Sequence, residues 1–380
     1  MKLGHVFAAA AVAAALVLTG APAAIGAERK PSVSVIASGL DNPRGIAVGK
    51  GGWLYVAEAG RGGDGPCIDG PEGDRQCLGD SAALTAVPPR LDRYAKPHRV
   101  ITGLPSLANE DGGSAIGLHD ISPAGTGLVA TIGGAFNLET RELLGAGGRL
   151  MGHVVALRPG VRAGAVKPIA DLNAYEARKN PDQGDPGSAV DSNPYGILAT
   201  PFGAFATDAG GNDLLRVGKR GKVSTVATFP ARLVTAPPIP DLPPQIPMQA
   251  VPTSVTWGPD GALYVGELTG FPFQKGAARV WRIVPGKAPT VYATGFTNIV
   301  DLAFDRRGRL LVLQISKEGL LAGDPNGALI RVDKRGGERT ELAAGRLTAP
   351  GGVVVGGDGA IYVTNKSIVA GGGEVLRIRA

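Results

Sequence analysis

The sequence is poor in charged and aromatic residues. Charged residues make up 19% of the 380 positions and aromatic residues 5%, whereas there are 59 glycines and 30 prolines. Glycine and proline are unfavourable inside helices, and a disordered chain would carry more charge and fewer apolar residues than the 44% found here. The composition therefore predicts an all-β protein of many short strands joined by turns.

Long apolar runs are absent after the first residues. The run Val6–Leu18 follows Lys2 and precedes small residues up to Ala27, which is the layout of a secretory signal. A membrane anchor is the alternative, but the run is shorter than the roughly 20 residues that span a bilayer. We expect residues 1–27 to be a signal peptide cleaved after about residue 23 to 27, residues 31–380 to form a single domain, and no transmembrane segment to remain. The protein is then secreted, extracellular or held in the cell envelope.

Cysteine is scarce. The only two cysteines, Cys67 and Cys77, lie in the polar loop RGGDGPCIDGPEGDRQCLGD. Two thiolates without a nearby histidine do not complete a zinc shell. In an oxidising compartment a close pair of this kind is most simply a disulfide.

Motifs for nucleic-acid binding and for several enzyme classes are also missing. The net charge of +6 comes from scattered basic residues rather than a stripe, which favours solubility and not a nucleic-acid groove. The sequence contains no nucleophile elbow, P-loop or zinc motif.

One pattern is present six times: a tight turn, a short apolar strand and, in most copies, a polar residue where that strand ends. The copies are GKGGWLYVAEAG (49–60), AGTGLVATIGG (124–134), TPFGAFATDAGG (200–211), GPDGALYVGEL (258–268), DRRGRLLVLQIS (305–316) and GGDGAIYVTNKS (356–367).

Each copy sits inside a unit of four strands. An apolar segment such as NPRGIAV or NPYGILA precedes it, and a third and a fourth strand follow. The sixth unit ends at its third strand, while PSVSVIASGL (31–40) is an orphan of fourth-strand type, so joining them closes a ring. We predict a six-bladed β-propeller of four-stranded antiparallel blades whose last blade is completed by the N-terminal strand. The third strands are predicted as RLDRY, HVVAL, DLLRV, RVWRI, ALIRV and EVLRI, with their recurrent arginine as a contact between blades.

The long connections all fall on one side of this predicted propeller. The turns between first and second strands are tight in every copy, whereas the insertions lie between second and third or between fourth and first strands. Loops tolerate length on any face, so a one-sided distribution indicates a binding face.

Polar side chains gather on that face. Glu267 ends its second strand, and oxygen-bearing residues occupy the same place in four other blades, with Ile132 in the second. Such side chains commonly accept hydrogen bonds from backbone N–H groups nearby. Alternatively, they converge on a hard cation, of which Ca²⁺ suits an oxygen-rich set best. The predicted metal ligands are Glu58, Asp208, Glu267 and Asn365, with Gln314 at the rim.

Further candidates lie on the inner strands. His119 and Asp120 are the candidate catalytic residues, because a histidine facing the channel can act as a general acid or base; a structural role for His119 is the alternative. Asp301, Asn193 and Tyr195 are predicted to line the channel rim.

The run VPTSVTWGPDGALYVGELTGFPFQKGAARVWRIVPG, with GFTNIVDLAFD, GALIRV, DSNPYGI and GLDNPRGI, resembles the ScyD/ScyE family of secreted propeller proteins. That family is similar to the NHL-repeat and gluconolactonase-like six-bladed propellers. The resemblance implies export and the propeller fold but no defined reaction. The lactonase-like group holds a divalent cation with acidic and amide side chains, an arrangement that Glu58, Asp208, Glu267 and Asn365 resemble in residue type.

Two functions follow as hypotheses. The first is a non-catalytic exported propeller that binds a small molecule, glycan or protein on the loop-rich face. The second is a Ca²⁺-dependent lactonase or hydrolase, in which the ion polarises a carbonyl and His119 or a carboxylate activates water. A quinone-dependent sugar dehydrogenase is disfavoured, because no paired His and Arg set for that cofactor is recognisable. We favour binding over catalysis, since the fold alone does not determine activity.

Overall fold

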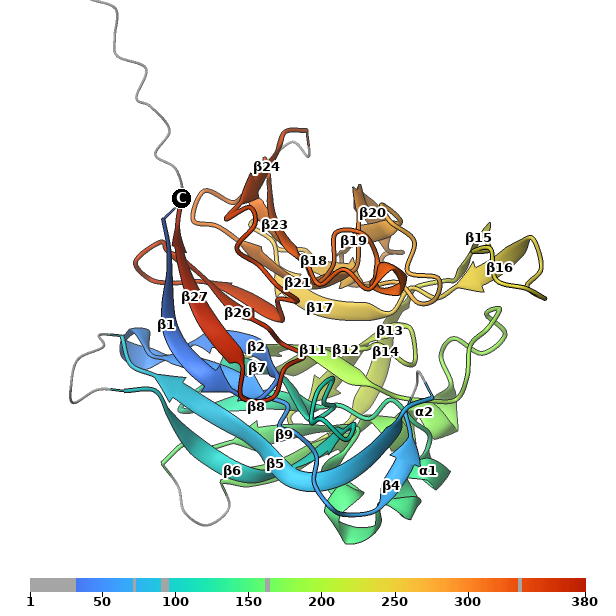
Figure 1. Cartoon of the computed structure of the whole chain (residues 1–380), viewed down its shortest axis with the longest axis horizontal. Coiled ribbons are helices and arrows are strands. Elements are labelled where there is room, and N and C mark those ends of the chain that lie inside the picture. Colours follow the sequence, from blue (N-terminus) through green and yellow to red (C-terminus); the bar gives the residue numbers. More distant parts are fainter. Residues whose placement is uncertain (1–31, 71–72, 90–95, 161–164, 334–336) are drawn as a thin grey trace, which may run out of the picture. The chain divides into compact units, whose positions relative to one another are not determined.

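The chain folds into a six-bladed β-propeller. A computed structural model describes residues 32–70, 73–89, 96–160, 165–333 and 337–380, and residues 31–380 form one unit (Figure 1). The predicted signal peptide lies outside the described residues. Blade 1 contains β2 (Pro43–Val48), β3 (Leu54–Glu58), β5 (Arg75–Val87) and β6 (His98–Ala108), and β4 (Cys67–Asp69) pairs with the start of β5.

Blades 2 to 5 are antiparallel sheets of four strands that follow one another along the chain. Blade 2 is β7 (Leu118–Ala124), β8 (Gly127–Ile132), β9 (His153–Leu157) and β10 (Val166–Asp171); blade 3 is β11 (Pro194–Thr200), β12 (Gly203–Asp208), β13 (Asp213–Gly218) and β14 (Val223–Thr228). Blade 4 is β17 (Pro252–Trp257), β18 (Leu263–Glu267), β19 (Ala278–Ile283) and β20 (Thr290–Phe296); blade 5 is β21 (Ile299–Phe304), β22 (Leu310–Gln314), β23 (Ala328–Val332) and β24 (Arg339–Leu342).

Blade 6 confirms the predicted closure. Its strands are β25 (Gly352–Val355), β26 (Ile361–Asn365), β27 (Gly373–Arg379) and β1 (Ser32–Leu40), in which β1 pairs antiparallel with β27 from Ser32↔Arg379 to Leu40↔Gly373. The two strands run side by side in Figure 1 although they come from opposite ends of the sequence.

The tight turns between first and second strands share one geometry in blades 4, 5 and 6. In each, a glycine with positive φ closes the turn: Gly261, Gly308 and Gly359 have φ 76°, 72° and 78°. A positive φ favours glycine because glycine has no Cβ. An aspartate in the same turn (Asp260, Asp305 or Asp358) accepts a hydrogen bond from the backbone N–H two residues later. These compact turns keep the connections between first and second strands short in these blades.

The connections on the other face carry the remaining elements. They are the helices α1 (Leu138–Leu143) and α2 (Leu172–Lys179), the short 3₁₀ segments η2 (Gly145–Leu150) and η3 (Leu320–Ala322), and the hairpin β15 (Arg232–Thr235) with β16 (Gln245–Met248). A further 3₁₀ turn, η1 (Lys50–Gly52), joins β2 to β3. The β15–β16 hairpin projects from the sheets in Figure 1.

Neighbouring blades are joined by threonine hydroxyls. Thr253 of blade 4 donates to the carbonyl of Ile299 in blade 5 (2.8 Å), and Thr364 of blade 6 donates to the carbonyl of Arg44 in blade 1 (2.5 Å). Thr131 of blade 2 makes the equivalent bond to the carbonyl of Tyr195 in blade 3. These bonds satisfy buried backbone acceptors between sheets that share no ladder.

Two predictions need correction. The third strand of blade 1 is β5, Arg75–Val87, rather than the RLDRY segment, whose residues 90–94 lie outside the described residues. The recurrent arginines Arg282 and Arg377 do not bridge blades: they pair with Asp260 and Asp358, the turn aspartates of their own blades. Each arginine lies closer to the turn of its own blade than to the neighbouring blade, so it pairs with the aspartate of that turn.

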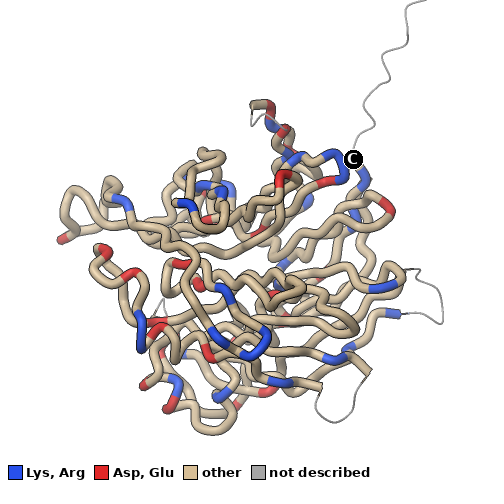
Figure 2. Tube along the Cα trace, turned by 180° about the vertical axis from the view of Figure 1, so that it is seen from behind, with Lys and Arg blue, Asp and Glu red and all other residues tan. Residues whose placement is uncertain are grey.

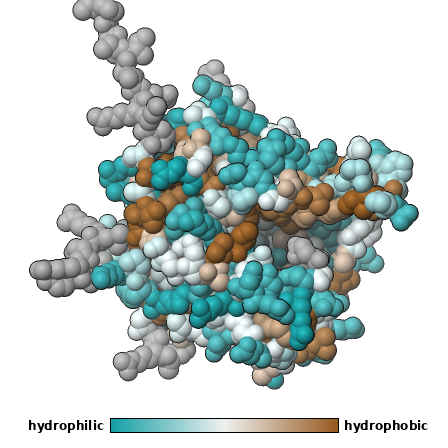
Figure 3. Space-filling view, viewed as in Figure 1, coloured by the Kyte–Doolittle hydropathy of each residue, from teal (hydrophilic) through white to brown (hydrophobic). Residues whose placement is uncertain are grey.

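The disulfide prediction is confirmed. Cys67 and Cys77 are directly opposite each other in the β4–β5 pair and are bonded. Among the described residues, no helix is both long and apolar enough to pass through a lipid bilayer. Lys and Arg are interspersed with Asp and Glu along the chain (Figure 2), and apolar surface is broken up by polar residues (Figure 3).

The closure by β1 generates a stability prediction. Leu40 is 4% exposed and packs with Ile46, Leu54 and Val56, whereas Val35 on the same strand is 51% exposed. We expect Leu40→Ala to lower the free energy of unfolding by about 2–5 kcal/mol, because it leaves a cavity between blades 6 and 1. Val35→Ala is the control and should cost less than about 0.5 kcal/mol. Urea unfolding of both variants measures the difference; equal effects would show that the closing strand contributes little.

Candidate functional site

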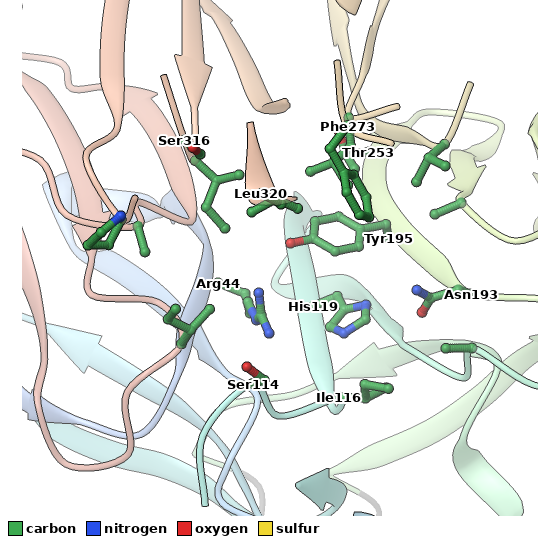
Figure 4. Close-up of a pocket in the computed structure, with 18 of the residues that line it drawn as sticks. Arg44, Ser114, Ile116, His119, Asn193, Tyr195, Thr253, Phe273, Ser316 and Leu320 are labelled. Carbon is green, nitrogen blue, oxygen red and sulfur yellow. The ribbon is translucent and has the colours of Figure 1, made fainter. Parts of the chain in front are cut away.

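A cavity of about 640 Å³ opens at the loop-rich end of the central channel. The strands β2, β7, β11 and β17 contribute Arg44, His119, Tyr195 and Thr253 (Figure 4). Strand ends and connections of all six blades contribute the rest of the wall. Most of that wall is apolar, including Ile116, Leu268, Phe273, Ile315 and Leu320. Apolar walls with a few convergent polar groups are typical of small-molecule sites.

Four of the polar residues come from one repeat position; the others are Asp74, Gln76, Ser114, Asn193, Ser316 and Asp324. Aligning the inner strands places Arg44, His119, Tyr195 and Thr253 at the same point, immediately after Pro43, Leu118, Pro194 and Pro252. The register between first and second strands shifts at this point in each of these four blades. Because a β-bulge turns a side chain out of the regular pleat, it directs these residues into the cavity.

Arg44 is a buried cation without a carboxylate partner. The residue is only 8% exposed. Its Nη2 donates to the carbonyl of Ala115 (2.8 Å), and its Nε has no hydrogen-bond partner. None of the ion pairs within 4 Å in the described part of the chain includes it. Buried charges are normally paired, so this guanidinium favours an anionic group in the cavity.

His119 is held neutral beside it. The ring Nδ1 lies 3.0 Å from the carbonyl oxygen of Pro194, which can only accept, so Nδ1 carries the proton. Burial, and secondly the charge of Arg44, lower the pKa of His119 to about 3. The ring packs on that of Tyr195 with centroids 4.6 Å apart. His119 therefore offers Nε2 as a neutral acceptor.

Tyr195 directs its hydroxyl into the same space (Figure 4). Burial raises the pKa of this phenol, and the Arg44 guanidinium opposes the rise. Tyr195 is therefore a hydrogen-bond donor at neutral pH, next to the cation.

Asp120 and Asp301 form a second feature of the channel. They lie one position beyond His119 and Val300 on β7 and β21, in blades 2 and 5, which are three blades apart in the ring of six. Each carboxyl accepts its own strand's N–H and one from the next blade, Ile197 for Asp120 and Val353 for Asp301. Burial and the charge of Asp301 raise the pKa of Asp120, and burial raises the pKa of Asp301 to about 7.

The predicted rim residues divide into two groups. Asn193 and Tyr195 line the cavity. Glu58, Asp208, Gln314 and Asn365 instead accept hydrogen bonds from the backbone N–H of Asp41, Asn193, Thr297 and Thr348, 15 to 17 residues earlier in the sequence. Each one fastens the segment that leads into the inner strand of its own blade.

Glu58 and Glu267 are further occupied by arginines. Glu58 pairs with Arg99 (2.7 Å) and Glu267 with Arg279 (2.8 Å), and Trp281 Nε1 donates to Glu267 (2.6 Å). Within the described ranges, no three His, Cys, Asp or Glu side chains form a group that could hold a metal ion. The calcium ring of Glu58, Asp208, Glu267 and Asn365 thus stays a prediction from sequence.

Arg44, Phe273 and Leu320 line the cavity but were not among the residues predicted from the sequence. The signal for Arg44 was the match between NPRG and NPYG, which places it where Tyr195 stands in blade 3. Phe273 and Leu320 come from connections between second and third strands, for which no repeat predicts a direction.

Comparisons with known proteins show the fold and no family. No family model matches the chain, and no curated protein matches it. Among solved structures, it is similar to a PQQ-bound aldose sugar dehydrogenase from Streptomyces coelicolor (16% identity, 92% of this chain and 98% of that chain, TM-score 0.51). It is also similar to a proposed gluconolactonase (11%, 92% and 92%, TM-score 0.50) and to a protein of unknown function from Bacteroides thetaiotaomicron (9%, 92% and 75%, TM-score 0.53).

The buried acids of the channel generate a pH prediction. The ordinary pKa of Asp301 is 3.8 and its folded value is about 7, so the folded chain binds more protons than the unfolded chain between these values. The contribution of this group to the free energy of unfolding is therefore fully present below about pH 4 and is lost as the pH rises through 7. Asp301→Asn resembles the protonated acid and should remove this loss, on the order of a few kcal/mol.

Melting temperatures measured from pH 4 to 8 test this prediction. The melting temperature of Asp301→Asn should rise relative to that of the wild type as the pH rises. The exposed control Asp64→Asn should instead give a curve parallel to that of the wild type. Parallel curves for Asp301→Asn would contradict the shifted pKa.

Proposed function

We propose that this chain is an exported propeller of the ScyD/ScyE kind that binds a small organic anion with an apolar body in the channel cavity. The observation that carries the proposal is Arg44, a buried guanidinium with a free Nε at an apolar cavity of about 640 Å³. A carboxylate, sulfonate or phenolate would receive charge-assisted hydrogen bonds there. Tyr195 and His119 would add one donor and one acceptor, and Phe273 and Leu320 would contact the apolar body.

Export rests on the predicted signal peptide, with which the Cys67–Cys77 disulfide is compatible. The disulfide belongs to the hairpin that carries Asp74 and Gln76 to the cavity wall. It would therefore hold one side of the proposed site in an oxidising compartment.

The alternative is hydrolysis of a lactone or ester. Its support is the neutral His119 beside Arg44, since a base and a cation near one carbonyl are what acyl transfer requires. Against it stands the pKa of about 3 for His119, because a general base works best when its pKa is close to the working pH. We therefore favour binding.

Binding of 8-anilinonaphthalene-1-sulfonate, an apolar anion, tests the proposal by fluorescence. We expect one site per chain and a loss of affinity of about 10- to 100-fold in Arg44→Gln, the effect of losing a charged hydrogen bond. Arg44→Lys keeps the charge and should keep most of the affinity. Arg307→Gln, at an exposed turn on the opposite face, is the matched control and should bind like the wild type.

A neutral probe of the same shape, N-phenyl-1-naphthylamine, separates charge from general apolar binding. Its affinity should be unchanged by Arg44→Gln. Equal binding of the anionic probe by wild type and Arg44→Gln would contradict the proposal, and turnover of a lactone or ester panel that is lost in His119→Asn would favour the hydrolase.

A further inference from the structure

Five carboxyl groups meet where the connection into blade 3 packs against the β12–β13 turn. Four are almost fully buried: Glu176, Asp182, Asp208 and Asp213 are 2%, 5%, 1% and 0% exposed. The fifth, Asp191, is partly buried. We call this set, with the side chain of Asn180, the blade 3 acid cluster.

The turn at Gly210 and Gly211 shows how closely the acids pack. A Cβ on Gly210 would lie 2.8 Å from Asp191 Oδ2, and a Cβ on Gly211 would lie 2.9 Å from Glu176 Oε2 and 3.7 Å from Asp208 Cγ. The two glycines therefore leave space into which the acids pack, at Gly210 together with the backbone carbonyl of Asp191.

The charge of the cluster is not compensated. No ion pair within 4 Å in the described part of the chain involves any of the five acids. Asp208 accepts four hydrogen bonds, but neither carboxyl oxygen of the fully buried Asp213 has any partner. A buried polar group without a partner requires an unseen water, proton or ion.

Neighbouring acids act on Asp213 from the cluster itself. Burial raises the pKa of Asp213, and the charges of Asp208, Glu176 and Asp182 raise it further. Burial and the neighbouring charges likewise raise the pKa of Glu176 to about 8. Asp213 is also directly opposite Asp208 in the β12–β13 pair, so the two side chains point to the same side of the sheet. Added positive charge there would stabilise the acids.

Asn180 provides the geometry of a coordination shell. One atom of its amide lies 3.0 Å from Glu176 Oε1 and 2.8 Å from Asp182 Oδ1. Without an ion, the nitrogen occupies this place and donates to both acids. A half-turn of the amide about its Cβ–Cγ bond would bring the oxygen there instead, so that three oxygens would surround an ion. For ligands about 2.4 Å from a calcium ion, oxygens about 2.9 Å apart subtend ~74°, close to the ~72° between neighbours in a pentagonal bipyramid.

We propose that the blade 3 acid cluster binds one Ca²⁺, with Glu176, Asp182 and the Asn180 amide oxygen as ligands and Asp213 and Asp191 supplying further charge. An all-oxygen set of this kind favours a hard cation over a transition metal. The proposed ligands are two carboxylates and one amide. They are therefore not a group of three His, Cys, Asp or Glu side chains, the kind that is absent from the described residues. Of the ring predicted from sequence, only Asp208 belongs to it.

The ion would fasten α2 and the segment that follows it to blade 3. Asn180 ends α2 with a left-handed backbone, and Asp182 also accepts a hydrogen bond from Asn212 at the β12–β13 turn (3.0 Å). Binding would therefore stabilise a connection of the loop-rich face rather than the cavity itself.

Calorimetric titration of the chelator-treated full chain with CaCl₂ tests the proposal. We expect one Ca²⁺ per chain, and a melting temperature that rises by at least ~3 °C in 5 mM Ca²⁺, the effect of ligand binding to the folded state alone. Asp182→Asn and Asp213→Asn should each lose at least tenfold in affinity. Asp213→Asn should also melt higher than the wild type in the absence of calcium, since it removes an uncompensated charge.

Two control variants locate the ion. Asp64→Asn, an exposed acid outside the cluster, should bind calcium like the wild type. Glu267→Gln should also respond to calcium. If Glu267→Gln abolishes binding while Asp213→Asn does not, the ion lies in the channel ring and the proposal is wrong.

A measurement without variants covers the case in which a substitution prevents folding. Arg178 and Lys179 at the exposed end of α2 are trypsin sites next to the cluster. Calcium should slow cleavage there at least fivefold and leave cleavage at Arg307 unchanged. Absence of binding at 5 mM Ca²⁺, unaltered affinity in both cluster variants, or unchanged cleavage after α2 would each overturn the proposal.

Discussion

The pairing of β1 with β27 is the constraint on which the rest of the structure depends. It joins Ser32–Leu40 to Gly373–Arg379, so the first and last described strands share one sheet and the ring closes. Without closure, a row of blades would have no common axis and no shared channel mouth. Because the ring is closed, equivalent positions of six inner strands meet around one space, and the cavity with its polar groups is the result.

Close approach of the inner strands decides which residues stand at that space. A Cβ on Gly45 would lie 2.1 Å from Asp120 Oδ1, and a Cβ on Gly196 would lie 2.7 Å from the carbonyl oxygen of Thr253. At these two positions the neighbouring strand leaves no room for a side chain. The channel holds Arg44, His119 and Tyr195 and, one position further along, Asp120 and Asp301. The charges of Arg44, Asp120 and Asp301 act on the pKa of other groups in this set through a medium with little water.

Compensation of charge separates the structural acids of this protein from the candidate functional ones. Glu58 and Glu267 end second strands like Asp208, but each is bonded to an arginine of its own blade. In the blade 3 acid cluster and at Asp301 no such partner is present among the described ion pairs. Arg44 is the converse case, a cation without an acid. Unpaired buried charge, rather than residue type, is what points to a ligand.

The sequence by itself determined the six units, the closing strand, the disulfide and the strands of every blade except the third strand of blade 1, because each depends on local periodicity, on turn residues or on a short spacing between cysteines. It also singled out His119, Asn193 and Tyr195, which line the cavity. Only the tertiary structure decided the direction and partners of the oxygen-bearing side chains. Glu58 meets Arg99, 41 residues away, and Glu176 on α2 meets acids of the β12–β13 turn. Such contacts depend on how separate connections pack on one face, and no periodic pattern records that packing.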